Sequence, residues 1–295
     1  MINKNVLVTG ANGMIGRQLV KLLKEKNYNV TETDLPDDLR NRDVCREVCT
    51  GQDIVFHLAG IKGSPIRCME SPASFSVPMI QFNANMIEAS HNANVEWFLY
   101  TSSVGVYSPS EVFYEDDVWK TFPSKNDWYP GWAKRIGELN VQSYMGETGN
   151  KNCSIVRPAN VYGPYDNFGE YSMVIPSLIK KGIESTDGKL HVWGDGIPIR
   201  DFIYSKDVAC GMLHMVENKV TDPVNLASGT GITIGQIAEI ISNYFNLTVE
   251  YDITKPNGDL RRQLSTDRAE SYGFSPMMDL ENGIKKTIDW YLNDR

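Results

Sequence analysis

Three glycines at a fixed spacing, directly after a short apolar run, constrain the fold of this chain more than any other feature of its sequence. Gly10, Gly13 and Gly16 lie in TGANGMIGRQLV, after the apolar run Val6–Thr9 and around the start of a segment of helical period. Glycine permits a tight turn and lets the backbone approach a pyrophosphate, whose charge the amino end of a helix favours. The spacing therefore predicts a strand, a phosphate-binding turn and a helix, rather than a glycine-rich turn with no ligand.

Short apolar runs alternate with longer segments of helical period through the first 165 residues. The apolar runs predict buried strands at Val6–Thr9, Asn29–Thr33, Ile54–Leu58, Trp97–Thr101 and Ser154–Arg157. The segments between them predict helices at Met14–Lys26, Phe75–His91 and Trp132–Thr148. Strand, helix, strand in this order indicates helices on both faces of a parallel sheet, so the predicted fold class is α/β with a Rossmann-type, doubly wound parallel sheet.

Beyond residue 165 the pattern becomes mixed, with loops rich in glycine, proline and aspartate. Helices are expected around Val174–Lys181, Lys206–Glu217, Ile234–Phe245 and Leu280–Leu292. We predict a dinucleotide-binding domain over residues 1–165, with a later return segment near 200–229, and a smaller mixed α/β substrate-binding lobe over 166–295.

Composition argues against several classes of partner. The formal net charge of −8 argues against a nucleic acid, and no stretch approaches the roughly 20 apolar residues of a membrane span. The first ten residues contain no signal-peptide core. The five cysteines are an odd number at scattered spacings, so we expect reduced thiols in a cytoplasmic protein and no metal site.

Asp34 follows Gly16 by 18 residues, at the end of the second predicted strand. A carboxylate there can accept hydrogen bonds from both ribose hydroxyls of an adenosine and would repel a 2′-phosphate. This favours NAD over NADP as cofactor. The alternative is that Arg40 or Arg42 folds back to bind a 2′-phosphate.

Several further motifs resemble the extended short-chain dehydrogenase/reductase family. They are HLAG (57–60), TSS (101–103), AKRIGE (133–138), RPANVYGP (157–164), VWGDGIPIRDFIYSKDVA (192–209) and PNGDLRR (256–262), which cover nearly the whole chain in order. GPYDNF (163–168), VIPSLI (174–179) and PNGDLRRQL (256–264) look most like sugar-nucleotide epimerases and reductases, and GDP-fucose synthases in particular. The resemblance implies an NAD-dependent enzyme that remodels the sugar of a UDP- or GDP-linked nucleotide sugar.

The resemblance also implies which residues bind the cofactor and which act in the reaction. The implied NAD-binding residues are Gly10, Asn12, Gly13, Met14, Ile15, Gly16, Asp34, Asp43, Val44, Leu58, Ala59, Gly60, Lys134 and Pro158. The family oxidises or reduces a sugar carbon with a serine or threonine, a tyrosine that exchanges the hydroxyl proton, and a lysine that lowers the tyrosine pKa. Ser103, four residues before Tyr107, matches the serine, and Lys134 matches the lysine. The alternative for Ser102 and Ser103 is that these strand-end hydroxyls only cap backbone groups.

The tyrosine departs from the family pattern. The family places it four residues before the lysine, where this chain has Pro130, and Tyr129 is five residues before Lys134. On a regular helix an offset of four residues turns by about 40°, whereas five turns by about 140°. Because proline is favoured in a first helical turn, we expect Tyr129 just outside the helix, with Gly131 giving the backbone freedom, and assign the acid–base role to Tyr129. The alternative is that Tyr129 is a surface aromatic residue and that the catalytic chemistry of the protein is altered or lost.

Other departures narrow the reaction. Gly105 and Met173 align with a cysteine and a histidine that move protons in fucose synthases, so 3,5-epimerisation is not expected. Ser102 and Ser103 stand where 4,6-dehydratases carry an Asp-Glu pair, so water elimination is not expected. Simple redox chemistry at one sugar carbon remains.

The substrate diphosphate is expected at Arg200 and Arg261, where related enzymes hold it, because guanidinium donors engage phosphate oxygens in pairs. Trp193 either stacks on a base or belongs to the core. The full substrate-binding set implied by the resemblance is Ser102, Ser103, Asn160, Val174, Arg200 and Arg261.

Three functions remain open. The leading hypothesis is an NAD-dependent epimerase that acts at sugar C4 through a transient 4-keto intermediate. The second is an NAD(P)H-dependent 4-keto-sugar-nucleotide reductase without 3,5-epimerase activity, and the third is a catalytically decayed nucleotide-binding protein. Phe75–His91 and Trp132–Thr148 also carry apolar residues on more than one face. Because such helices often pair across a two-fold axis in the family that this chain resembles, the resemblance implies a homodimer with a four-helix interface.

Overall fold

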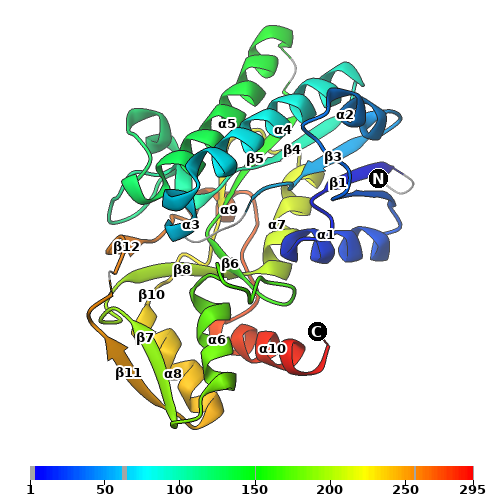
Figure 1. Ribbon diagram of the computed structural model, residues 1–295. Coiled ribbons are helices and arrows are strands. Elements are labelled where there is room, and N and C mark those ends of the chain that lie inside the picture. The colour runs from blue at the N-terminus through cyan, green and yellow to red at the C-terminus, as the bar shows by residue number, and fades with distance from the viewer. Residues whose placement is uncertain (1–3, 62–64, 150, 256, 295) are drawn as a thin grey trace.

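A six-stranded parallel sheet forms the larger part of the molecule (Figure 1). The structure is a computed structural model that describes residues 4–61, 65–149, 151–255 and 257–294. All neighbouring strands of this sheet run parallel, which confirms the predicted Rossmann-type fold class. In sheet order the strands are β2 (Asn29–Thr33), β1 (Asn5–Thr9), β3 (Ile54–His57), β4 (Trp97–Thr101), β5 (Cys153–Pro158) and β9 (Val224–Leu226).

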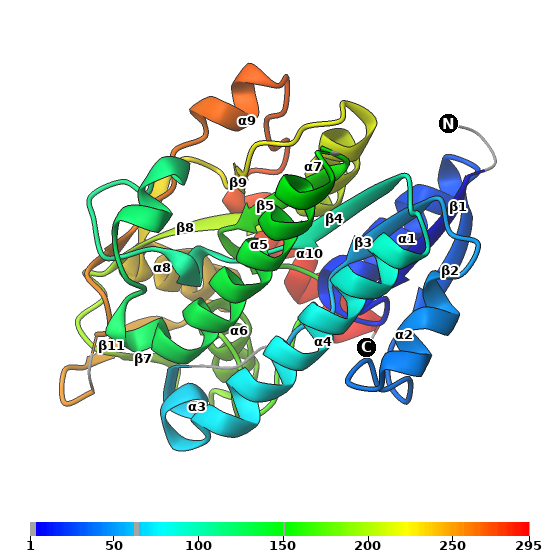
Figure 2. The same cartoon turned by 90° about the horizontal axis from the view of Figure 1, so that it is seen from above.

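Helices cover both faces of this sheet, because alternate residues of each strand point to opposite sides. Val6 and Val8 of β1 belong to one apolar cluster, and Leu7 between them belongs to another. The first face carries α1 (Met14–Glu25) and α7 (Ser205–Glu217), and the second carries α2 (Arg42–Cys49), α4 (Pro72–Asn92) and α5 (Trp128–Thr148). Figure 2 shows α4 and α5 side by side along the outer surface.

The order of the strands places a crevice next to β1. The chain passes from β1 to β2 on one side and then returns to β3 on the other side of β1. Connections that leave a sheet in opposite directions open a crevice at the carboxyl ends of the two strands, which is where ligands bind in folds of this kind. Gly10 follows β1, and Leu58 follows β3, so both lie at this crevice.

The rest of the chain packs near the carboxyl ends of the strands of the large sheet. A third apolar cluster joins α6 (Val174–Glu184), α8 (Ile234–Phe245) and α10 (Leu280–Asn293) to two small sheets. The strands of these sheets are β6 (Asn160–Tyr162), β8 (Ile199–Tyr204), β10 (Gly231–Thr233) and β12 (Arg261–Arg262) in one, and β7 (Lys189–Trp193) and β11 (Thr248–Asp252) in the other. Short helices complete the chain: α3 (Pro65–Glu70), α9 (Asp267–Ser271) and the 3₁₀ turns η1 (Val104–Val106), η2 (Glu115–Lys120) and η3 (Lys125–Asp127). The division at residue 165 stays a prediction.

One predicted boundary is wrong in a way that matters for the site. α5 begins at Trp128, four residues before the predicted start, so Tyr129 lies within the helix rather than outside it. The first turn of a helix has no intrahelical partners for its backbone N–H groups, so Pro130, which lacks this group, does not stop the helix from extending past it.

Within the described residues, no helix is long and apolar enough to cross a membrane.

Candidate active site

The glycine loop closes against the carboxyl end of β3. Gly10 has a φ of +68°, and a Cβ atom at this position would lie 2.9 Å from the backbone nitrogen of Ala59. This close approach requires glycine and brings Leu58, Ala59 and Gly60 next to the loop. Gly13 precedes α1, whose first turn contains the predicted residues Met14, Ile15 and Gly16.

Asp34 faces this loop from the end of β2. Its carboxylate accepts hydrogen bonds of 2.8 Å from the backbone N–H groups of Asn12 and Leu35. Arg40 is paired with Asp38, and Arg42 lies 3.7 Å from Glu88, so both arginines have acidic neighbours on the surface. The hydrogen bonds from Asn12 and Leu35 thus hold the Asp34 carboxylate at the glycine loop.

The other two residues predicted for the adenosine side lie in the first turn of α2. Asp43 has an exposed carboxylate 3.1 Å from Arg46, and Val44 packs against the apolar cluster beneath α4.

Lys134 lies beside the same crevice. Its ammonium group donates a 2.7 Å hydrogen bond to the carbonyl oxygen of Thr101, at the end of β4. A Cβ atom on Gly60 would lie 3.8 Å from the Lys134 Nζ, so the ends of β3 and β4 both border this lysine. Burial lowers the pKa of Lys134 to about 8, because the charged form loses hydration there. Pro158, at the end of β5, is buried on the next strand.

A buried hydrogen-bond chain supports Lys134 from behind, and two of its members were not found from the sequence. The ring nitrogens of His57 lie 2.8 Å from the Thr9 hydroxyl and 3.0 Å from the Asn83 amide oxygen. The Asn83 amide donates to the Tyr100 hydroxyl, which donates to the backbone carbonyl of Lys134. Burial lowers the pKa of His57 to about 3, so this ring is neutral. Asn83 and Tyr100 have no local sequence signal, because only packing brings α4 onto β4.

The two serines after β4 have different surroundings. Ser103 is half-buried, and its hydroxyl oxygen accepts a hydrogen bond of 3.1 Å from the N–H of Gly105. The hydroxyl proton of Ser103 can therefore still be donated to a ligand. Ser102 is only 4% exposed and donates its hydroxyl to Glu138, which forms a buried bidentate pair with Arg157. Ser102 thus lies in an internal ion-pair network, which is not the role predicted for it.

Tyr129 points differently from Lys134. Its side chain is 46% exposed, and it precedes Lys134 by five residues on the continuous helix α5. Pro130 occupies the position four residues before Lys134. The acid–base role of Tyr129 stays a prediction.

The two arginines predicted to hold the diphosphate differ in their charged neighbours. It is half-buried on β8, and within the described residues no carboxylate forms an ion pair with it. Burial lowers its pKa to about 10. Arg261 donates to the Gln263 side chain at 2.6 Å and lies 3.7 Å from the exposed Glu111. Arg262, by contrast, is paired with Asp127 and Asp259.

The remaining predicted substrate residues, Asn160 and Val174, lie on β6 and α6. Asn160 donates its amide to the backbone carbonyl of Asp201 at 2.8 Å, and Val174 begins α6. Pro256, the first residue of the PNGDLRR motif, lies outside the described residues.

A cation-flanked tryptophan extends this region. Trp193 is 55% exposed, so it is a surface residue, and the ammonium groups of Lys181 and Lys255 lie 5.1 and 5.5 Å from its ring centre. Asn257 accepts a hydrogen bond from the N–H of Asp195, in the turn after Trp193, and a Cβ atom on Gly258, the next residue, would lie 3.6 Å from a terminal nitrogen of Arg200. Lys181 was missed by sequence reasoning, since only the packing of α6 on β7 brings it to Trp193.

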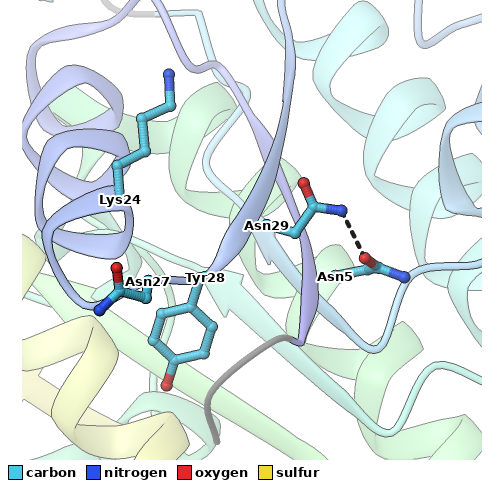
Figure 3. A pocket seen from close by; sticks show the side chains of 5 residues that line it. All are labelled: Asn5, Lys24, Asn27, Tyr28 and Asn29. Atoms are coloured by element: carbon cyan, nitrogen blue, oxygen red, sulfur yellow. Dashed lines mark hydrogen bonds between the residues drawn. The ribbon is translucent and has the colours of Figure 1, made fainter.

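A depression elsewhere on the surface is not part of this site. Figure 3 shows its lining residues Asn5, Lys24, Asn27, Tyr28 and Asn29, with a 2.7 Å hydrogen bond from the Asn29 amide to the Asn5 side chain. These residues lie at the amino ends of β1 and β2, whereas Gly10 and Asp34 lie at the carboxyl ends. In the part of the chain that the structure describes, no group of three or more histidine, cysteine, aspartate or glutamate residues could hold a metal ion.

Known proteins resemble this chain along its whole length. It is 29% identical to a GDP-L-fucose synthase of Sinorhizobium fredii, over 99% of this chain and 96% of the relative. A GDP-L-fucose synthetase of Naegleria fowleri bound to NADP matches with a TM-score of 0.86 and 25% identity, over 100% of this chain and 95% of that one. A UDP-N-acetylglucosamine 4-epimerase of Methanobrevibacter ruminantium, in complex with UDP-N-acetylmuramic acid, matches with a TM-score of 0.88 and 26% identity, over 100% of both chains.

A model of the NAD dependent epimerase/dehydratase family matches residues 6–227. This match covers most of the chain, including the glycine loop and all six strands of the parallel sheet except the first residue of β1. The resemblance found in the sequence is therefore confirmed, and the chain belongs to the NAD dependent epimerase/dehydratase family.

Proposed function

We propose that this protein is an NAD-dependent nucleotide-sugar epimerase that acts at sugar C4 through a transient 4-keto intermediate. The observation that carries the proposal is the carboxylate of Asp34, held at the glycine loop by the N–H of Asn12. A carboxylate there favours the free ribose hydroxyls of NAD over the 2′-phosphate of NADP. An epimerase regenerates its own bound NAD and needs no supply of NADPH.

The residues at the crevice fit this cofactor. The glycine loop and the first turn of α1 would hold the pyrophosphate, Asp34 the adenosine ribose, and Lys134 the nicotinamide ribose. Bound NAD would accept hydride from a sugar carbon and return it to either face. Ser103 would donate a hydrogen bond to the sugar oxygen, and Arg200 and Arg261 would hold the diphosphate.

The proton of the sugar hydroxyl also needs an acceptor. The sequence assigns this exchange to Tyr129, and the assignment stays a proposal, since α5 turns its side chain away from that of Lys134. Tyr129→Phe tests it, because this change removes only the hydroxyl. A fall in turnover of about 10²–10⁴-fold with unchanged binding would support the assignment.

A second candidate is a 4-keto-sugar-nucleotide reductase that consumes a reduced nicotinamide. It is favoured by the similarity to GDP-L-fucose synthases, one of which was solved with NADP bound.

One experiment separates these functions from a decayed binding protein. Purified protein is incubated with UDP-glucose, UDP-galactose and GDP-mannose, and separately with NADH or NADPH and a 4-keto nucleotide sugar, while the absorbance at about 340 nm is followed; the sugars are then identified by NMR. An epimerase inverts C4 without net absorbance change or added cofactor. A reductase leaves these sugars unchanged and oxidises NADH or NADPH only with a 4-keto sugar. A decayed protein does neither, which would overturn the proposal.

We further propose a homodimer in which α4 and α5 of two copies form a four-helix interface. The outer face of these helices carries apolar side chains, including Val77 and Leu139, which are 48% and 51% exposed.

A further inference from the structure

A carboxylate lies near Ser103, just before the start of α5. We propose that Asp127 is an acid–base group of this site and exchanges the proton of the sugar hydroxyl. This inference rests on the proposed function and concerns the step assigned above to Tyr129.

Asp127 directly precedes the first turn of α5, with φ −119° and ψ 23°, so its side chain leaves the chain at the amino end of this helix. Tyr129 lies within the helix and is displaced from Lys134 by about 140°, because it precedes Lys134 by five residues.

Gly105 shows how near Asp127 is to Ser103. A Cβ atom added to Gly105 would lie 3.5 Å from the Ser103 hydroxyl oxygen and also 3.5 Å from the carboxyl carbon of Asp127. The hydroxyl and the carboxyl group thus flank the same point. Because Gly105 has no side chain, no side-chain atom of this residue lies between the Ser103 hydroxyl and the Asp127 carboxyl group.

Asp127 shares its cationic partner with a second carboxylate. Arg262 contacts Asp127 through one of its terminal nitrogens, and its Nε donates to Asp259 at 2.9 Å. Asp259 also accepts from the Ser124 hydroxyl and the Asn126 amide. Two carboxylates therefore share one guanidinium, and the three groups carry a net charge of −1. If Asp127 takes a proton, Arg262 still has Asp259 as its partner.

The proposed step is balanced with the bound cofactor of the proposed function. The O–H bond of the sugar hydroxyl breaks, and its proton passes to a carboxylate oxygen of Asp127. Bound NAD would supply the acceptor for the C–H electron pair of that carbon as hydride, and the sugar carbon would become a ketone. Asp127 returns the proton when hydride comes back.

Asp127→Asn and Asp259→Asn form a matched pair for the test. Both carboxylates bind Arg262, and their side chains are similarly shielded, at 17% and 12% exposed. If Asp127 only anchors Arg262, the two variants should behave alike. If Asp127 exchanges the proton, Asp127→Asn should lose about 10²–10⁴-fold in turnover at saturating substrate, while Asp259→Asn should retain most of it.

Binding gives a readout that does not depend on turnover. Calorimetry is carried out on the NAD-loaded protein with UDP-glucose and GDP-mannose, and with UDP and GDP, which lack the sugar. Loss of a charged acceptor for the sugar hydroxyl should weaken binding of the nucleotide sugar by about tenfold or more in Asp127→Asn. The affinity for the bare nucleotide should stay at the wild-type value.

The outcomes distinguish this inference from the proposed function. If the wild-type protein binds none of the nucleotide sugars, the proposed function fails and this inference fails with it. If the wild type binds and turns over a sugar but Asp127→Asn matches Asp259→Asn, or only Tyr129→Phe loses turnover, this inference alone is wrong. Should Asp127→Asn fail to fold, Asp127→Glu keeps the charge for Arg262. The extra methylene of glutamate displaces the carboxylate, so turnover of Asp127→Glu should be lower than that of the wild type by at least about tenfold. Full wild-type turnover in this variant would contradict the proposal.

Discussion

Gly131, in the first turn of α5, lies directly against the backbone carbonyl oxygen of Gly105 in η1. A Cβ atom on Gly131 would overlap this oxygen and would meet the ring of Pro123 at 2.7 Å. The glycine thus permits a close approach between α5 and the loop that carries Ser103. The expectation that Gly131 gives Tyr129 freedom to move is wrong, since this contact fixes the first turn of the helix.

Gly131→Ala should destabilise the protein by about 1–3 kcal/mol, because the added methyl group has no space and forces the backbone to shift. Gly146→Ala, in the same helix, is the control. A Cβ atom there meets nothing within 4 Å, and alanine favours helix, so this variant should be neutral or more stable by up to about 1 kcal/mol. Thermal unfolding of the two variants checks the contact. Equal melting temperatures would show that α5 does not pack on η1 in this way.

The wild-type protein should bind NAD(H) more tightly than NADP(H), because the Asp34 carboxylate repels a 2′-phosphate. Asp34→Asn should reduce this preference by removing the charge. Calorimetry with the four nucleotides measures both effects. An equal affinity, or a preference for NADP(H) in the wild type, would remove the main support for an epimerase that recycles its own cofactor.

Arg200→Ala should weaken binding of a nucleotide sugar by about 2–3 kcal/mol, the usual cost of a lost charge-assisted hydrogen bond, and Arg261→Ala should act in the same direction. The affinity for NAD should hardly change. Arg46→Ala, which removes a guanidinium that is 61% exposed on α2, is the control. Normal substrate binding by both site variants would show that the diphosphate lies elsewhere.

The pKa of Lys134 predicts a pH dependence of stability for the protein without cofactor. Burial lowers this pKa from 10.5 to about 8, so between these values the unfolded chain holds the proton that the folded protein has lost. Stability therefore rises with pH through this window, and the cost of the buried charge is fully present below it. Lys134→Met should be more stable than the wild type at pH 7, with the difference shrinking toward pH 10. Denaturant unfolding at several pH values checks this, and a difference that does not vary with pH would contradict it.

The proposed dimer predicts the effect of a charge on the outer face of α5. Leu139→Glu should give a monomer, because a carboxylate in an apolar interface loses its hydration. Leu292→Glu is the matched control, since Leu292 on α10 is also 51% exposed. Light scattering at micromolar concentration measures the masses. A monomeric wild type, or a dimer in both variants, would show that α4 and α5 do not form the interface.

Most of the sheet could be predicted because its signals are local. An apolar run, a glycine spacing and a helical period each depend on residues close together in the chain, and β1, α1, β2 and the position of Asp34 follow from them. The predicted start of α5 was wrong for a local reason as well. The predicted helix begins at Trp132, whereas α5 continues back through Gly131 and Pro130 to Trp128, because a first helical turn tolerates proline.

The sequence alone thus determined the fold class, the glycine loop and the placement of Ser103 and Lys134 at one edge of the sheet. Only the tertiary structure decided what surrounds them: Ser102 on Glu138, Tyr100 behind Lys134, and Asp127 with Arg262 beside Ser103. These pairs are separated by 34 to 135 residues in the chain. Their contacts depend on how whole helices pack against strands, and a side chain's position in that packing is not encoded by its neighbours in sequence.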